Sequence, residues 1–240
     1  MRRLTILALV LGLFACFNTP APAEEPALES DDQKMLYALG QAVARGISTL
    51  EFTDEEMVYI QMGLRDAATG KESRVDMAQF GPRLDSTMQA RVTQLAQREN
   101  EAGKIYCDQQ ASVEGAEKLP SGLIFQALAA GDGPAPVPGD QVKVHYHGTL
   151  RDGTVFDSTR GKDPVQFAVT GVIPCFSEGL QKLNAGGKAR LTCPSQIAYG
   201  DRGSPPKIKP GAALTFEVEL VEVVGKPAAA AAPAEPEPIP

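Results

Sequence analysis

The stretch from Val142 to Ser158, written VKVHYHGTLRDGTVFDS, constrains the fold of this chain more than any other. Its first residues alternate between apolar and polar side chains, and this period of two indicates a strand with one buried face and one solvated face. Asp152 and Gly153 then form one of the strongest short signals for a hairpin turn, because both residue types tolerate positive φ. We therefore predict an antiparallel hairpin here.

Three side chains of this hairpin suggest a binding site. Tyr146 falls on the apolar face of the first strand, and the second strand carries Phe156 and Asp157. An acid beside an aromatic residue, opposite an inward tyrosine, indicates an apolar pocket with one polar group, and an ordinary hairpin core is the alternative. His145 and His147 lie on the opposite face, where they form an incomplete metal pair, so we predict two solvated histidines and no metal site.

The rest of the C-terminal half decides between these alternatives. Six separated blocks agree in order and spacing with the FKBP-type peptidyl-prolyl isomerases: VHYHGTL, DGTVFDS, GVIPCFSEGL, GGKARL, IAYGDRG and LTFEVELVEV. The chain resembles this family over about residues 122–224. The resemblance implies an α+β fold, with a bent antiparallel sheet wrapped on a short helix. It also implies isomerisation of X-Pro bonds by desolvation and stabilisation of the twisted amide, without cofactor or metal.

The resemblance assigns site residues position by position. The catalytic set that it implies is Tyr146, Phe156, Asp157, Ile173 and Tyr199. Within this set Asp157 is the polar group of the pocket, Ile173 offers a backbone N–H to the substrate carbonyl, and Tyr199 offers a hydroxyl. The substrate-binding set is Phe167, Val172, Phe176, Ile208 and Phe216. Phe176 stands where the family commonly has Trp, and Ser204-Pro205-Pro206 departs from the usual loop, so substrate preference and macrolide binding stay open.

Residues 24–118 carry helical patterns. Apolar residues three or four apart between Leu36 and Leu50 predict a first helix that begins near Ser30 or Asp31. Thr53 and Glu56 form a capping-box pattern for a second helix, and a third is expected beyond Gly81-Pro82 as far as Ser112. This order, with a long connecting helix, is similar to the macrophage infectivity potentiator type of FKBP. The apolar stripes are thin, so we expect a homodimer that buries them; internal packing is the alternative.

The first 23 residues are typical of an export signal. Arg2 and Arg3 precede an apolar segment too short to span a bilayer, and Ala21-Pro22-Ala23 resembles a cleavage site. Leu13-Phe14-Ala15-Cys16 also resembles a lipobox, in which Cys16 would anchor the protein to a membrane. Both alternatives place the protein outside the cytoplasm: in the periplasm of a Gram-negative-type envelope, or as an outer-membrane lipoprotein.

An oxidising compartment would permit disulfides. The family fold implies that Cys175 and Cys193 come near each other, so we predict a bridge between them; two buried thiols are the alternative. Cys107 is then expected to be a free thiol on the long helix, and an interchain bond is the alternative. The formal net charge of −7 argues against nucleic acid as a partner.

The predicted organisation is a signal peptide (1–23), a helical dimerisation domain with its connecting helix (24–118), an isomerase domain (119–225) and a disordered tail rich in Ala, Pro and Glu (226–240). The expected partners are proline-containing unfolded or exported polypeptides. The competing function is a dimeric holdase, in which two separated pockets grip one unfolded chain and isomerisation is secondary.

Overall fold

The computed structural model describes residues 26–225, so the predicted signal peptide, Cys16 and the tail from residue 226 lie outside the described residues. Within this range the chain divides between Ala42 and Val43 into two compact units, each described here by itself. Among the described residues no helix combines the length and the apolar character that crossing a membrane requires.

The first unit contains most of helix α1 (Asp31–Ala44). Gln33 accepts backbone hydrogen bonds from Glu29 and Ser30 and so holds the start of the helix. The helix buries none of its residues, and Leu36 and Leu39 are 68% and 59% exposed. The prediction that it continues to Leu50 was wrong, because the α-helix ends at Ala44. After it the backbone hydrogen bonds join residues three apart, from Ile47 N–H to Ala44 O and from Leu50 N–H to Ile47 O, and so form turns.

Helix α2 (Asp54–Ala68) has the capping box predicted from its sequence. The Thr53 hydroxyl accepts a 3.2 Å hydrogen bond from the Glu56 N–H, and the Glu56 carboxylate accepts a 2.8 Å bond from the Thr53 N–H. These bonds satisfy two amide groups that a helix start otherwise leaves unpaired.

Helix α3 (Met77–Ala111) begins earlier than predicted and includes Pro82. The Asp76 carboxylate accepts a 2.8 Å hydrogen bond from the Ala78 N–H and so caps the helix ahead of the proline. Pro82 stands only five residues after Met77, and it removes a single intrahelical donor near the helix start. A strong cap can therefore outweigh the breaking effect of a proline in this position.

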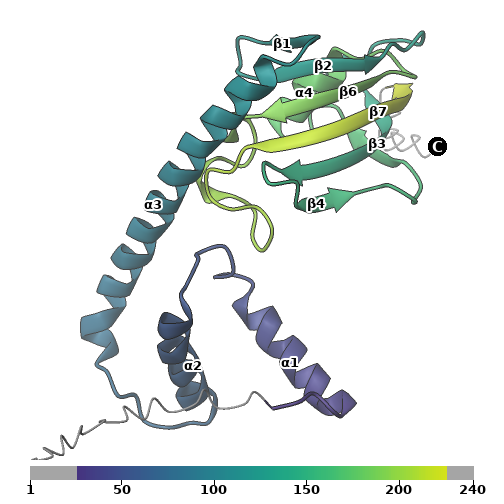
Figure 1. Cartoon of the computed structure of the whole chain (residues 1–240). Helices are drawn as coiled ribbons and strands as arrows, with labels where there is room; N and C mark the ends of the chain where they lie inside the picture. The colour runs from purple at the N-terminus through teal and green to yellow at the C-terminus, as the bar shows by residue number, and fades with distance from the viewer. Residues whose placement is uncertain (1–25, 226–240) are drawn as a thin grey trace, which may run out of the picture. The chain divides into compact units, whose positions relative to one another are not determined.

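Seven strands of the described residues 26–225 form one antiparallel sheet (Figure 1). The strands are β1 (Ala116–Lys118), β2 (Ile124–Ala129), β3 (Gln141–Leu150), β4 (Val155–Ser158), β5 (Val165–Ala168), β6 (Lys188–Cys193) and β7 (Leu214–Gly225). Their order is β1-β2-β6-β7-β3-β4, and β5 pairs with the first half of β3. The register places Tyr146 opposite Val218 and Gly148 opposite Phe216. The α+β fold expected for this half of the chain is confirmed.

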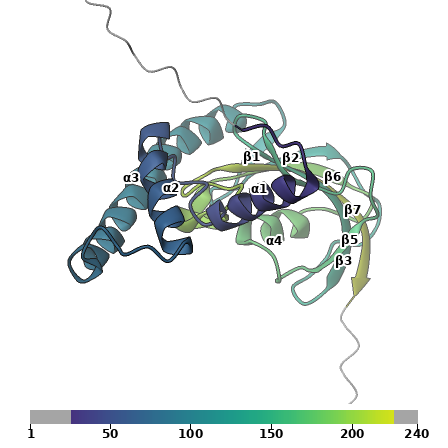
Figure 2. The same cartoon turned by 90° about the horizontal axis from the view of Figure 1, so that it is seen from below.

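Helix α4 (Pro174–Gln181) lies against the sheet, as the view from below shows (Figure 2). It approaches closely because Gly179 has no side chain: a Cβ there would lie 2.4 Å from a methyl group of Leu191 on β6. The predicted disulfide between Cys175 and Cys193 is present and joins this helix to β6, with the two Cα atoms 5.8 Å apart. The bond therefore fixes the helix that forms the bottom of the pocket.

The last turns of α3 pack against the sheet, which belongs to the same second unit. Gly103 is buried, and a Cβ at this position would lie 3.0 Å from the Cβ of Ala213. This glycine therefore serves close packing. Cys107, one turn further on, is a buried free thiol as predicted, and burial raises its pKa to about 11. Two short 3-10 turns, η1 (Ser195–Ile197) and η2 (Gly200–Arg202), connect β6 toward β7.

Candidate functional site

A pocket of about 510 Å³ opens between the sheet, helix α4 and the loops that precede β7. The lining comes from β3, β4, β5, the link from β5 to α4, the start of α4, the link between η1 and η2, and β7. Its lining residues are Tyr146, Phe156, Asp157, Phe167, Gly171, Val172, Ile173, Phe176, Tyr199 and Phe216. Every residue of the two predicted sets belongs to this lining except Ile208.

Ile208 lies on the loop between η2 and β7, beside the pocket, and is outside the lining given above. Its side chain is 4% exposed and belongs to the hydrophobic core cluster, and it is not part of the pocket lining. Its backbone closes a small loop through two hydrogen bonds with Ser204, of 2.8 and 3.0 Å. The side chain lies in the same core cluster as the pocket residues Phe156, Phe176 and Phe216, so burial alone does not separate Ile208 from the pocket, and its substrate-binding role stays a prediction.

The aromatic side chains pack edge to face, except for the tilted pair Tyr146–Phe167. Phe176 on α4 is the centre of the group, with ring centroids 5.2 Å from Phe216, 6.0 Å from Tyr146 and 6.3 Å from Phe167. Phe156 and Phe216 form a further T-shaped pair at 5.4 Å. Such contacts favour fixed ring orientations, so the apolar lining is formed in advance and does not depend on a ligand.

The polar group of the pocket is a hydrogen-bonded pair. The Tyr146 hydroxyl donates a 2.5 Å hydrogen bond to Asp157 Oδ2, and Asp157 Oδ1 accepts a 2.8 Å bond from the Ser158 N–H. Burial, reinforced by the Asp157 carboxylate, raises the pKa of Tyr146 above its ordinary value. The phenol therefore stays protonated, and its hydrogen bond fixes the direction of the Asp157 carboxylate at the pocket wall.

Two further polar groups at the pocket are free to bind a ligand. Ile173 precedes α4, and no hydrogen bond among residues 26–225 uses its backbone N–H. Tyr199 is 39% exposed between η1 and η2, and in the same part of the chain its hydroxyl makes no hydrogen bond. An extended peptide entering the pocket could therefore bind both donors without displacing a protein acceptor.

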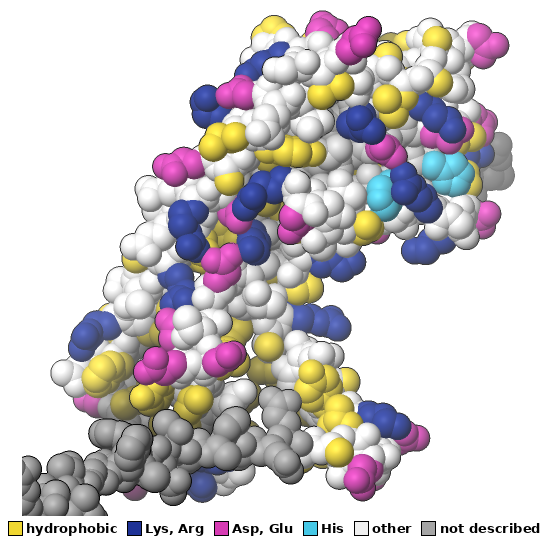
Figure 3. Space-filling view, in the orientation of Figure 1, with side chains coloured by type: hydrophobic (Ala, Val, Ile, Leu, Met, Phe, Trp, Pro, Cys, Tyr) yellow, Lys and Arg dark blue, Asp and Glu magenta, His cyan; other side chains and the backbone are white. Residues whose placement is uncertain are grey.

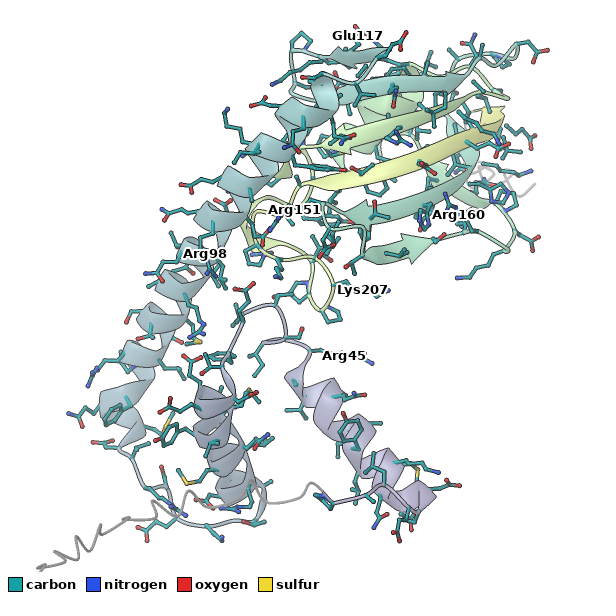
Figure 4. All side chains as sticks on the ribbon, in the orientation of Figure 1. Arg45, Arg98, Glu117, Arg151, Arg160 and Lys207 are labelled. Atoms are coloured by element: carbon teal, nitrogen blue, oxygen red, sulfur yellow. A yellow bond between two sulfur atoms is a disulfide. The ribbon has the colours of Figure 1, made fainter. Side chains whose placement is uncertain are left out.

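The loop beside the pocket is attached to the strand that carries Asp157. Lys207 lies on the loop between η2 and β7 (Figure 4), and its ammonium donates a 2.6 Å hydrogen bond to the carbonyl of Phe156. This contact joins the loop to β4 next to the aspartate. Sequence reasoning missed it, because a lysine in a loop gives no signal of its partner.

The histidines lie on the other face of the sheet, among basic and acidic side chains (Figure 3). His145 Nδ1 lies 3.3 Å from the Thr159 hydroxyl and His147 Nδ1 lies 3.0 Å from the Ser158 hydroxyl. Both side chains are half-buried, so they are less solvated than expected. Within residues 26–225, no three His, Cys, Asp or Glu side chains are grouped so that they could hold a metal ion.

Comparison with known proteins identifies the family. The family model described as FKBP-type peptidyl-prolyl cis-trans isomerase matches residues 133–221, and the model of the domain amino-terminal to it matches residues 32–127. The FKBP-type peptidyl-prolyl cis-trans isomerase FkpA of Escherichia coli K12 is 35% identical, over 96% of this chain and 94% of the relative. This chain belongs to the FKBP-type peptidyl-prolyl cis-trans isomerase family. The enzyme class expected from the six sequence blocks is thereby confirmed.

Other FKBP-type relatives span the same two regions. The peptidyl-prolyl cis-trans isomerase Mip of Coxiella burnetii is 33% identical over 94% of this chain and 100% of the relative. The crystal structure of FkpA from Escherichia coli superposes with a TM-score of 0.61 at 35% identity, covering 84% of this chain and all of that one. The architecture of a helical N-terminal region followed by an FKBP domain is therefore shared with these isomerases.

Proposed function

We propose that the aromatic pocket catalyses rotation about X-Pro bonds in unfolded, exported polypeptides, and that Tyr146, Phe156, Asp157, Ile173 and Tyr199 act on the bond. The observation that carries this proposal is the preformed apolar pocket of about 510 Å³ with its free polar groups Ile173 N–H and Tyr199 OH. The proposed substrate-binding residues are Phe167, Val172, Phe176, Ile208 and Phe216; the first three and Phe216 belong to the pocket lining, and Ile208 belongs to the core cluster that adjoins it.

The proposed mechanism follows from the electronic structure of the amide. Rotation costs roughly 18–20 kcal/mol because resonance keeps the peptide planar, and water stabilises the polarised planar form through the carbonyl oxygen. A pocket lined by aromatic rings removes that water. The twisted amide has lost resonance and is less polar, so the apolar lining binds it more strongly than it binds the ground state.

Each polar group has a separate role in this mechanism. The Ile173 N–H and the Tyr199 hydroxyl bind carbonyl oxygens of the substrate chain on either side of the reacting bond and hold it in register. The Asp157 carboxylate, oriented by Tyr146 at 2.5 Å, faces the reacting amide as the single charged group of the lining. No covalent intermediate is required, since rotation breaks no σ bond.

A protease-coupled assay on a proline tetrapeptide tests the proposal. The full chain should accelerate isomerisation, and Asp157→Ala should lower kcat/KM by about tenfold, the scale of one interaction of about 1.4 kcal/mol. His147→Ala is the matched control, because it removes a polar side chain from the opposite face of the neighbouring strand β3. A homogeneous protein that leaves the uncatalysed rate unchanged would contradict the proposal.

We further propose that the protein is exported. The signal-like sequence of residues 1–23 supports this, as does a 30% identical relative, the outer membrane protein MIP of Legionella longbeachae. The intact mass of the protein from the native cell envelope distinguishes the two processing routes, a chain that begins at Glu24 and a chain that begins at an acylated Cys16. A retained Met1 would rule out both.

We propose a homodimer, because helices α1 to α3 leave large apolar side chains in solvent. The exposed side chains include Leu36, Leu39, Tyr59, Met77 and Leu84. A second copy of the chain offers the same surface and so could cover these residues. Light scattering should give twice the monomer mass, and Leu36→Glu with Leu39→Glu should reduce that mass toward the monomer. A wild-type monomer would contradict the proposal.

The same exposed side chains favour holdase activity as a second candidate function. Its test is protection of a proline-free client from aggregation after Asp157→Ala, which removes the proposed catalytic carboxylate alone.

Macrolide binding is expected to be weaker than in relatives that have Trp at the position of Phe176, since Phe is smaller and lacks an indole donor. Phe176→Trp should therefore strengthen it.

A further inference from the structure

We propose that helix α3 supports the isomerase site from outside the pocket, and that Asn100 on this helix is a positioning residue for Tyr199. This inference rests on the proposed role of Tyr199 in the pocket. Asn100 lies outside the segment that carries the FKBP sequence blocks and does not line the pocket. It would act through the two short 3-10 turns between which Tyr199 stands.

The Asn100 side chain makes three hydrogen bonds, all to these two turns. Its Nδ2 donates to Asp201 Oδ1 at 2.9 Å, in η2. Its Oδ1 accepts from the Ser195 hydroxyl and, at 3.3 Å, from Gln196 Nε2, both in η1. One amide on α3 thus joins the turn before Tyr199 to the turn after it.

The partners of Asn100 make this contact specific. Ser195 is 3% exposed, so its hydroxyl would lose its acceptor in a place that water reaches poorly. The Tyr199 backbone lies between η1 and η2, and the Tyr199 carbonyl accepts a hydrogen bond from the Gly203 N–H. Movement of either turn therefore moves the tyrosine.

The same face of α3 holds the chain that follows Tyr199 toward β7. Gly211 lies so close to the helix that a Cβ there would be 2.4 Å from the Ala96 carbonyl oxygen. Gly103 packs on Ala213, and the Tyr106 hydroxyl lies 2.8 Å from the Thr215 hydroxyl.

Residues 96, 100, 103 and 106 of the helix thus contact the segment 195–215 along its length. Thr215 immediately precedes Phe216, another pocket residue. The β3–β4 turn is also attached to this helix, because Arg151 Nε donates a 3.2 Å hydrogen bond to Glu99 Oε2; Figure 4 marks Arg151 on the turn. Two sides of the pocket are therefore supported by one helix.

The first experiment, on the full chain, exchanges the amide of Asn100 and the carboxylate of Asp201. Asn100→Ala and Asn100→Asp should each lower kcat/KM by about tenfold, because the first removes all three hydrogen bonds and the second replaces the bond to Asp201 by two facing carboxylates. Adding Asp201→Asn to Asn100→Asp restores one amide and one carboxylate in this pair and should recover most of the activity. Gln109→Ala, an exposed residue of the same helix, is the control. A swap that fails to recover activity would overturn the inference.

A double-mutant cycle separates positioning from general destabilisation. If Asn100 acts through the tyrosine, Asn100→Ala should have little further effect in a Tyr199→Ala background. Additive losses in kcat/KM would show that Asn100 does not act through Tyr199 and would overturn the inference.

Hydrogen exchange gives a readout that does not depend on activity. Asn100→Ala should raise amide exchange about tenfold in residues 195–203 and leave β3 (141–150) unchanged, because the loss is confined to the two turns. Unchanged exchange in residues 195–203 would overturn the inference even if the enzyme is active. A wild-type chain without isomerase activity would instead overturn the proposed function, whatever the exchange shows.

Discussion

The ring of Phe156 lies directly over Gly148 on the neighbouring strand. A Cβ built at position 148 would come within 2.5 Å of Phe156 Cζ. Phe156 is buried and packs edge to face on Phe216, so the ring cannot withdraw without disturbing a second pocket residue. The wall of the pocket therefore depends on a strand residue that has no side chain.

Gly148→Ala should accordingly damage both the pocket and the fold. Displacing Phe156 should lower kcat/KM, and overpacking should reduce the free energy of unfolding by about 1–3 kcal/mol. Gly63→Ala is the matched control: it lies inside helix α2 with nothing within 4 Å of the added Cβ, so it should stabilise the protein by about 1 kcal/mol. Denaturant unfolding and the tetrapeptide assay measure the two effects; wild-type activity in Gly148→Ala would contradict this account.

A pH dependence follows from Tyr146. Burial and the Asp157 carboxylate raise the pKa of Tyr146 in the folded protein above the value of about 10 that it has when unfolded. The folded state thus holds this proton more tightly, so its contribution to stability is complete below about pH 10 and is lost as the pH rises beyond it. Tyr146→Phe should flatten the fall in unfolding free energy above pH 10.

The exposed Tyr59 supplies the control for this measurement, because Tyr59→Phe removes a phenol that lies in solvent and not in a pocket. Urea unfolding at a series of alkaline pH values compares the three proteins. Equal slopes for wild type and Tyr146→Phe would show that the phenol is not perturbed.

Periodicity was enough to predict strand β3 within the hairpin, because its alternation of apolar and polar residues reports which face is buried. Thr53 and Glu56 were similarly informative, since a capping box is a local interaction. The pocket residues depended on the family blocks: no spacing in the sequence shows that Phe167 and Phe216 approach one Phe176 ring from different strands.

Sequence reasoning was less informative where distant contacts decide the outcome. Ile208 fits the family pattern and lies in the same core cluster as Phe176 and Phe216, so its place at the pocket stays a prediction. Gly148 and Asn100 attracted no attention, because the importance of each depends on a partner far away in the sequence or across a strand pair. Gly171, which also lines the pocket, gave no chemical signal at all.

The disulfide between Cys175 and Cys193 should stabilise the domain that it closes. The two residues are 18 positions apart, and a loop of that size restricts the unfolded chain by about 3 kcal/mol. Replacing both cysteines by Ala should lower the free energy of unfolding by about that amount. Cys107→Ala is the control, since this thiol is buried but unpaired. A reductant that destabilises the double variant as much as wild type would argue against this disulfide as the cause.

The last prediction concerns Arg91, which joins α3 to the start of α2. Its guanidinium bonds both oxygens of Glu56, at 2.7 and 2.9 Å, donates to the Leu50 carbonyl at 2.7 Å, and lies 4.4 Å from the Phe52 ring centroid. A lysine cannot reproduce this planar set of contacts, so Arg91→Lys should loosen α2 from α3.

The hydrogen bonds from Arg91, together with the capping bond from Thr53, lower the pKa of Glu56 to about 2. A carboxyl whose folded pKa is depressed contributes stability that is present above its unfolded pKa of about 4.3 and is lost as the pH falls toward 2. In Arg91→Lys the Glu56 carboxyl should therefore titrate closer to pH 4, and the α2–α3 contact should weaken at a higher pH than in wild type. Carboxyl chemical shifts in an NMR titration measure this directly. Arg83→Lys, on the same helix beside Phe80, is the control, and a Glu56 titration that is identical in all three proteins would refute the assignment of the shift to Arg91.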